Sequence, residues 1–275
     1  MTAPAEPSRD FAGRVAFITG AAHGQGRAVA LALAAAGADI VGFDVAAKIE
    51  YPAYAQASSD ELSSLKTEVE ALGRRALVFE GDVRDAAAIQ SAVDATIAQL
   101  GRIDVLFNNA GIVAYAAADE MTELEWDTMI GVNLTGPFLV ARSVIPVMKA
   151  QRSGVIINNS SVMGLRGGNR LSHYVASKHG LTGLTKAWAI ELAPFGIRVV
   201  SIHPTGVNTP MNDGLAELEG ATAIEIAERS AGNLLPGVPW IETQDVAELV
   251  LYLASDRARY ATGAQFTLDA GLLTR

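Results

Sequence analysis

Residues 14–26 read RVAFITGAAHGQG, a short apolar run followed by a turn that contains three glycines. Such a run is typical of a strand buried in a parallel sheet. The glycines allow a tight turn and a close approach to a diphosphate, and an Ala- and Leu-rich helix opens directly after them. A plain strand-to-helix turn is the alternative. The predicted dinucleotide contacts in this turn are Gly20, His23, Gly24, Gln25 and Gly26.

The rest of the chain repeats this alternation of strands and helices. Helices between successive strands imply crossover connections and a parallel sheet covered on both faces. The sequence therefore predicts one α/β domain over residues 11–275, a doubly wound Rossmann-type fold with a seven-stranded parallel sheet, after an N-terminal tail at residues 1–10. A long helix at residues 122–150 is expected to bend near Pro137 or Pro146. Further strands are expected at residues 39–43, 76–81, 105–108, 155–158, 199–203 and 265–268.

Two long connections interrupt the alternation, and such connections are usually functional or disordered. Residues 45–59 follow the second strand, so this insertion is expected near the cofactor; a surface loop without cofactor contact is the alternative. Residues 205–240 follow the sixth strand and are expected to form a lid over the substrate. Met211, Leu215 and Leu218 are predicted to form the inner face of that lid.

The composition disfavours several classes of function. Acidic residues outnumber basic ones by 30 to 21, which gives a net charge of −9, and no Lys- or Arg-rich run suggests binding to nucleic acid or to a membrane surface. The absence of cysteine excludes disulfides and thiolate catalysis, and the four histidines lack metal-ligand spacing, so no metal is expected. No apolar stretch suggests a membrane span or a signal sequence, so a cytoplasmic protein is expected.

Asp44 ends the second strand, 18 residues after the last glycine of the turn. A carboxylate at this place accepts hydrogen bonds from the adenosine ribose and repels a 2′-phosphate. The sequence therefore predicts NAD rather than NADP as the cofactor. A solvated loop carboxylate is the alternative.

Tyr174 and Lys178 are separated by four positions near the start of a predicted helix, which places both side chains on one helical face. A free tyrosine is a poor base at neutral pH, and a neighbouring ammonium is expected to lower its pKa. A proton transfer coupled to hydride transfer needs such an acid–base group.

Four motifs together resemble the short-chain dehydrogenase/reductase family. Their order and spacing match that family, and the resemblance covers residues 11–271, nearly the whole chain. It implies an NAD-dependent oxidoreductase that interconverts a secondary alcohol and its ketone. The motifs are the glycine-rich turn, NNAG at residues 108–111, Ser161 thirteen positions before Tyr174, and Lys178.

The resemblance also implies individual roles. Tyr174 is the acid–base catalyst, Ser161 binds the substrate oxygen, and Lys178 lowers the tyrosine pKa and binds the nicotinamide ribose. Asn133 interrupts a helix and holds a water in the proton relay, with a simple helix break as the alternative. Ser160 is the alternative to Ser161, and the spacing favours Ser161. The cofactor contacts beyond the turn are Asp44, Asp82, Val83, Asn109, Gly111, Tyr174, Lys178, Val207 and Thr209.

Three stretches resemble a narrower, carveol-dehydrogenase-like and mycofactocin-associated branch: the insertion at 45–59, HPTGVNTPM at 203–211 and LDAGLL at 268–273. This resemblance implies a cyclic or terpenoid secondary alcohol, NAD bound so tightly that it hardly exchanges, and an external electron carrier of the mycofactocin type. The family commonly forms homotetramers, and that state is expected here through the helices at about 122–150 and 172–192.

Three other functions are alternatives. A 3-oxoacyl thioester reductase of the same family would usually require NADPH, which Asp44 disfavours. A catalytically idle NAD-binding protein would not need the intact set of Ser161, Tyr174 and Lys178. An isomerase or dehydratase that reuses bound NAD would need a further acid–base residue, which the motifs do not supply.

Overall fold

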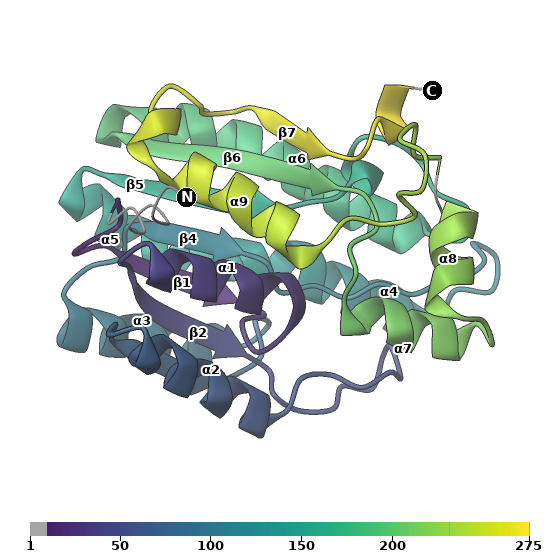
Figure 1. The fold of residues 1–275 in the computed structure, drawn as a ribbon, viewed down its shortest axis with the longest axis horizontal. Coiled ribbons are helices and arrows are strands. Elements are labelled where there is room, and N and C mark those ends of the chain that lie inside the picture. Colours follow the sequence, from purple (N-terminus) through teal and green to yellow (C-terminus); the bar gives the residue numbers. More distant parts are fainter. Residues whose placement is uncertain (1–9, 231, 275) are drawn as a thin grey trace, which may run out of the picture.

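The computed structural model describes residues 10–230 and 232–274, so the tail expected at 1–10 lies, apart from residue 10, outside the described residues (Figure 1). The sheet has seven strands in the order β3-β2-β1-β4-β5-β6-β7, and neighbouring strands are parallel throughout. This confirms the predicted fold class. The strands are β1 Val15–Thr19, β2 Asp39–Asp44, β3 Ala76–Glu80, β4 Val105–Asn108, β5 Gly154–Asn159, β6 Ile197–Pro204 and β7 Gln265–Leu268.

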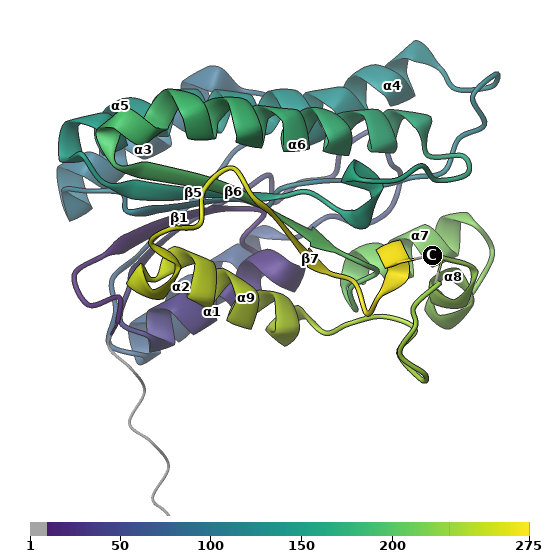
Figure 2. The ribbon, with the colours of Figure 1, turned by 90° about the horizontal axis from the view of Figure 1, so that it is seen from above.

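Helices cover both faces of the sheet (Figure 2). The helices α1, α2 and α9 pack on one face, and α3, α4, α5 and α6 pack on the other, while α7 and α8 lie together at one end of the molecule. Their bounds are α1 Gly24–Ala35, α2 Ser59–Ala71, α3 Ala86–Leu100, α4 Glu123–Ile130, α5 Gly136–Gln151, α6 Ser172–Leu192, α7 Pro210–Leu218, α8 Ala223–Ser230 and α9 Thr243–Ala254.

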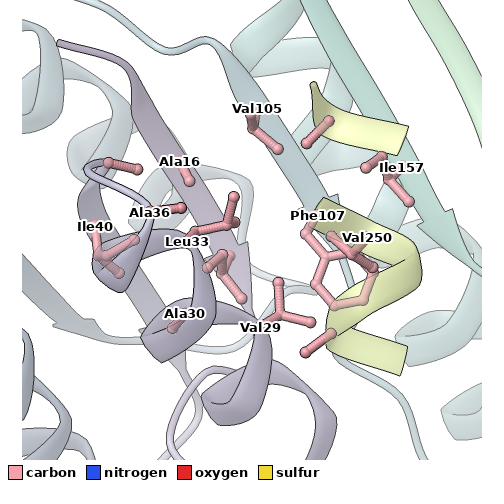
Figure 3. Packing of buried hydrophobic residues seen from close by; sticks show 14 of the residues in the cluster. Ala16, Val29, Ala30, Leu33, Ala36, Ile40, Val105, Phe107, Ile157 and Val250 are labelled. Atoms are coloured by element: carbon pink, nitrogen blue, oxygen red, sulfur yellow. The ribbon is translucent and has the colours of Figure 1, made fainter. Parts of the chain in front are cut away.

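The two cores follow from the alternation of side chains along each strand. In β1, Ala16 and Ile18 belong to the core beneath α1 and α9, whereas Val15 and Phe17 belong to the core beneath α3 and α5. Figure 3 shows the first core, in which α1 packs over β1 and β2 and Val250 of α9 lies near Phe107 of β4 and Ile157 of β5. Strands that are buried on both faces explain the continuous apolar runs in the sequence.

The position of the functional site follows from the strand order. The strands β1, β2 and β3 follow one another toward one edge of the sheet, and β4 then pairs with the other side of β1. The connections after β1 and β4 therefore leave the sheet on opposite faces, and a crevice forms between them at the carboxyl ends of these strands. Thr19 ends β1 and Asn108 ends β4 at this edge.

The helix expected at residues 122–150 is interrupted at Asn133, where the family resemblance places an interruption, and not at either proline. A π-helical turn, Gly131–Thr135, separates α4 from α5, upstream of both prolines. Asn133 is fully buried in this turn, and its side chain bonds both backbone groups of Ile112, each at 2.8 Å. Pro137 is the second residue of α5, so proline, which lacks an N–H, comes shortly after the π-helical turn.

Among the described residues, one helical stretch is long and apolar enough to cross a membrane by length and composition alone. It is Glu123–Gln151, which combines α4, the π-helical turn and α5. Val140, Val144 and Met148 of this stretch are fully buried in the core beneath α3 and α5. Packing in the α/β core therefore accounts for its apolar character.

Candidate active site

A pocket opens along the carboxyl edge of the sheet, between the connections that follow β1, β2, β4, β5 and β6. All of the predicted site residues line it except Gly26 and Asn133. The fold thus brings together residues that lie as far apart in the chain as Gly20 and Thr209.

The glycine-rich turn forms a cradle at one end of the pocket. A Cβ on Gly26 would lie 1.9 Å from the carbonyl oxygen of Gly20, and a Cβ on Gly20 would lie 2.9 Å from the Cα of Ala110. Only glycine fits at these two positions. His23 precedes α1 and makes no side-chain cap, so the first N–H groups of the helix remain available to phosphate. The turn therefore fits the diphosphate of a dinucleotide.

Asp44 is nearly buried, not solvated, with 7% of its surface exposed. Its carboxylate accepts hydrogen bonds from the backbone N–H of Ala22 at 2.9 Å and of Ala46 at 3.3 Å. These bonds hold the carboxylate at the pocket wall beside the glycine-rich turn. Among the described residues that line the pocket, Lys178 is the only Lys or Arg. Arg27, outside the lining, donates to the backbone oxygen of Ala22 at 3.0 Å and is paired with Glu68 at 2.6 Å.

Asp82 and Val83 line the pocket after β3. Arg84, which the sequence analysis did not single out, forms an ion pair with Asp82 at 2.6 Å. Burial by itself would raise the pKa of Asp82, but the hydrogen bonds from Arg84 outweigh it and the pKa is lowered. The carboxylate is therefore ionised at neutral pH.

Asparagines at the ends of β4 and β5 join the two sides of the crevice. Asn108 donates to Asn158 across the strands at 2.9 Å. Asn109 donates to the carbonyl oxygens of Thr19 and Gly20, both at 3.0 Å, so its amide group holds the glycine-rich turn against β4. Its own side-chain oxygen accepts from Asn159.

Asn159 is a pocket residue that the sequence analysis missed. Its side chain donates to Gln25 at 3.0 Å and to Asn109 at 2.9 Å, and its backbone oxygen accepts from Nζ of Lys178 at 2.8 Å. It therefore links the glycine-rich turn to α6. The sequence could have indicated it, because Asn159 is a polar residue directly after the fifth predicted strand, where the carboxyl ends of parallel strands meet.

Ser161, Tyr174 and Lys178 meet where β5 and α6 face each other. A hydrogen bond joins the side chains of Ser161 and Tyr174, and Nζ of Lys178 lies 5.6 Å from the centre of the tyrosine ring. The neighbouring Ser160 hydroxyl instead donates to the backbone oxygen of Lys178 at 3.1 Å. Of the two candidate serines, Ser161 is the one that contacts the tyrosine.

The pKa of Tyr174 corrects one expectation. Burial raises it to about 12, and the hydrogen bond from Ser161 lowers it only in part. Burial also lowers the pKa of Lys178 to about 8. Because the desolvation of both groups dominates, the tyrosine in this structure is held as a neutral phenol, contrary to the lowered pKa expected from the sequence.

Asn133 does not line the pocket, and its side chain is fully buried. Besides the two bonds to Ile112, its Nδ2 donates to the hydroxyl of Ser177 at 3.4 Å. Gly111 lies between this residue and Lys178: a Cβ on Gly111 would lie 3.3 Å from Oδ1 of Asn133 and 3.6 Å from Nζ of Lys178. The π-helical turn thus packs directly behind the loop that follows β4.

The insertion at 45–59 reaches farther than the adenosine end. The hydroxyl of Tyr54 accepts from the backbone N–H of Val113 at 3.2 Å, and its side chain, 4% exposed, lies against Gly214 of α7. The segment between β2 and α2 accordingly passes beside α7 (Figure 1). The insertion therefore spans the pocket from Asp44 to the segment expected to form the lid.

The other end of the pocket is apolar. Val207 and Thr209 line it where the chain leaves β6, and Met211 and Leu215 of α7 line it as expected for the inner face of a lid. Leu218 does not: 45% of its surface is exposed, because it lies on the outer side of the last turn of α7. Other apolar residues of the pocket lining include Ile112, Val113, Met163, Leu171, Ile226 and Leu272.

A sequence profile of short chain dehydrogenases matches residues 14–220. The chain belongs to the short chain dehydrogenase family. It is 43% identical over 270 residues to (-)-trans-carveol dehydrogenase of Rhodococcus erythropolis, covering 94% of this chain and 97% of that protein. It is 38% identical over 261 residues to a 3-oxoacyl-acyl-carrier-protein reductase of Thermotoga maritima, covering 95% of this chain and 98% of that protein.

A solved structure shows the same architecture. The crystal structure of carveol dehydrogenase from Mycobacterium avium in complex with NAD superposes with a TM-score of 0.89 at 38% identity, covering 96% of this chain and 99% of that chain. The predicted family and the carveol-dehydrogenase-like resemblance are therefore confirmed for this short chain dehydrogenase. The mycofactocin association stays a prediction.

Proposed function

We propose that this chain interconverts a cyclic, terpenoid-class secondary alcohol and its ketone. The observation that carries the proposal is the Ser161–Tyr174 hydrogen bond at the apolar end of a pocket whose other end holds Asp44. The more general prediction, that the chain is an NAD-dependent alcohol dehydrogenase, is confirmed by the family match and by the similar structure that contains NAD.

NAD, when bound, accepts or donates the hydride at its nicotinamide ring. Ser161 holds the substrate oxygen beside Tyr174, whose phenol gives its proton to that oxygen in reduction. In oxidation the tyrosinate takes the hydroxyl proton. Lys178 stabilises the tyrosinate through its positive charge, although Nζ also donates to Asn159. Because burial holds Tyr174 as the phenol, the free protein has the protonation state that reduction of a ketone requires. Oxidation of an alcohol requires that Tyr174 first lose its proton.

The substrate class follows from the walls of the pocket. Side chains of Met163, Leu171, Met211 and Leu215 suit a hydrocarbon ring, which gains free energy by leaving water. The relatives include a carveol dehydrogenase and a 3-oxoacyl reductase, so family membership does not choose between the two substrates. The buried carboxylate of Asp44 disfavours the NADPH that the reductase alternative would usually require.

Further parts of the proposal rest on the resemblance and on the position of the insertion. The insertion at 45–59 retains NAD, an external carrier of the mycofactocin type collects the electrons, and residues 205–240 act as the substrate lid. The enzyme works as a cytoplasmic homotetramer. Asn133 acts through a relay water, and the remaining predicted contacts hold the cofactor.

A substrate panel tests the proposal. The purified protein is assayed with cyclic terpenoid alcohols, acyclic secondary alcohols and 3-oxoacyl thioesters, with NAD or NADP, and with an artificial electron acceptor that oxidises bound NADH. We expect turnover of the cyclic alcohols with NAD, reduced by several orders of magnitude in Tyr174→Phe, which retains cofactor binding. Preferred turnover of the thioester with NADPH, or a Tyr174→Phe variant with a tenth of the normal activity, would contradict it.

A further inference from the structure

His203 occupies an interior position beside the catalytic serine. It is the penultimate residue of β6 and has no exposed surface. Its Nδ1 lies 2.7 Å from the backbone oxygen of Ser161, and its Nε2 lies 2.8 Å from the hydroxyl of Ser201. Both ring nitrogens are therefore engaged, one of them with the residue that contacts Tyr174.

The partners of His203 fix its tautomer. A carbonyl oxygen can only accept, so Nδ1 carries the proton and donates to Ser161, and Nε2 of the neutral ring accepts from Ser201. Burial lowers the pKa of His203, and the nearby basic groups Lys178, His179 and Lys186 lower it further, while the hydrogen bond to Ser161 raises it. The ring is therefore neutral at pH 7.

The backbone ladder between β5 and β6 stops before Ser161. The ladder between β5 and β6 ends with the N–H of Ser160 donating to Ile202 at 2.9 Å. The next residue of β6 that faces β5 is Pro204, which has no N–H. Beyond this point the His203 side chain joins β6 to the chain that leaves β5.

Without His203, Ser161 would be held mainly by its own turn. Its hydroxyl accepts from the N–H of Met163 at 3.1 Å, and its carbonyl accepts from the N–H of Gly164 at 2.8 Å. Both partners belong to the single 3-10 turn that follows, so they move together with Ser161. The imidazole connects this turn to a central strand.

We propose that His203 is a positioning residue, which holds Ser161 at the distance from Tyr174 that proton transfer requires. This proposal rests on the proposed function, because it assigns the Ser161–Tyr174 pair to catalysis. Misplacing a reacting group by about 1 Å can cost roughly 100-fold in rate. Loss of the imidazole donor should therefore lower kcat and leave the affinity for NAD nearly unchanged.

Two substitutions distinguish the effect of losing the hydrogen-bond donor from the effect of changing the volume of the side chain. His203→Phe keeps a ring but removes the donor, and we expect kcat to fall about 10–100-fold with less than a threefold change in the Kd of NAD. His203→Asn places an amide N–H where Nδ1 stood. Its kcat should exceed that of His203→Phe by at least a third of the difference in log kcat between wild type and His203→Phe. Ile202→Val, a buried change on the same strand, controls for loss of stability.

A second readout needs no turnover. The Ser161 hydrogen bond lowers the pKa of Tyr174, so a displaced serine should raise that pKa. Fluorine NMR of protein labelled with difluorotyrosine, with the signal assigned by Tyr174→Phe, compares wild type, His203→Phe and Ile202→Val. A higher phenol pKa in His203→Phe alone supports the proposal. An unchanged pKa, or the same change in Ile202→Val, overturns it, whether or not a substrate has been found.

The tautomer provides a test on the wild-type protein, which covers the case in which His203→Phe does not fold. Nitrogen NMR of histidine-labelled protein should show a buried ring protonated at Nδ1, and its signal should be absent from His203→Asn. A ring protonated at Nε2 would overturn the proposal. A different combination of results would contradict the proposed function alone. In that case the ring of His203 is protonated at Nδ1 and the phenol pKa is higher in His203→Phe, but the wild-type protein turns over none of the cyclic alcohols.

Discussion

The hydroxyl of Tyr51 lies 2.9 Å from Nε2 of His173, the residue directly before Tyr174 in α6. Tyr51 belongs to the insertion at 45–59, and 122 positions separate it from its partner. His173 is fully buried, and burial lowers its pKa, so the ring is neutral at pH 7. The insertion is thereby attached to the first turn of α6, the helix that contains Tyr174 and Lys178.

Removing this attachment should accelerate the release of the cofactor. Tyr51→Phe deletes one hydrogen bond, and combined with Tyr54→Phe it deletes two, so we expect the NAD dissociation rate to rise roughly 2- to 10-fold per bond. Stopped-flow displacement of NADH fluorescence measures it. Tyr260→Phe, at a tyrosine with 89% of its surface exposed, is the matched control. Equal rates in all the variants would make the insertion an ordinary surface loop.

Asp44→Ser should narrow the preference for NAD. The change removes a negative charge that would face the 2′-phosphate of NADP and an acceptor for the adenosine ribose. We expect the ratio of the Kd of NADP to that of NAD to fall about tenfold or more. Calorimetry with both cofactors measures it. Glu80→Gln, at the exposed residue paired with Asp44 in β3, tests for a general charge effect and should leave the ratio unchanged.

The rates of oxidation and reduction should depend differently on pH. Burial raises the pKa of Tyr174 to about 12, so the tyrosinate that oxidation needs is a small fraction at pH 7 and grows as the pH rises. We expect single-turnover oxidation to accelerate between about pH 6 and 9, whereas reduction, which uses the phenol, should not accelerate. An oxidation rate that is flat over this range would show that deprotonation of Tyr174 does not limit it.

Lys178→Met should stabilise the fold while removing activity. Burial lowers the pKa of Lys178 from 10.5 to about 8, so below pH 8 the folded state holds a charge that it disfavours. This penalty is complete below pH 8 and disappears as the pH rises to the unfolded pKa of 10.5. Allowing for the lost bond to Asn159, we expect a gain of roughly 1–3 kcal/mol at pH 7 and less at pH 10 by denaturant unfolding. A loss of stability at pH 7 would show that interactions in the folded state outweigh the desolvation of the Lys178 ammonium group.

Gly214→Ala should loosen the proposed lid. A Cβ at this position would lie 2.6 Å from the Cβ of Tyr54, and neither atom belongs to the flexible end of a side chain. Helix α7 must therefore move away from the insertion, and we expect a higher KM for the alcohol and faster amide exchange in α7. Gly183→Ala, on α6 with nothing within 4 Å of the added Cβ, is the control. A KM equal to that of the control would contradict a lid held by Tyr54.

The sequence by itself determined the features that depend on local order along the chain. The apolar run before the glycine-rich turn predicts the strand, turn and helix, because the pattern of buried side chains and the need for glycine are local properties. The four-residue spacing of Tyr174 and Lys178 predicts one helical face for the same reason. Asp44 could be assigned to the pocket because the carboxyl ends of parallel strands meet at one edge of the sheet.

Only the tertiary structure decided the features that depend on contacts between distant segments and on burial. The buried amide group of Asn133 binds the backbone of Ile112, a contact between two separate segments that no local pattern in the sequence predicts. The bond between Tyr51 and His173 joins the insertion to helix α6, a contact that no local pattern in the sequence encodes. The pKa of Tyr174 rises instead of falling because the fold removes water from the phenol, and this desolvation outweighs the effects of its neighbours.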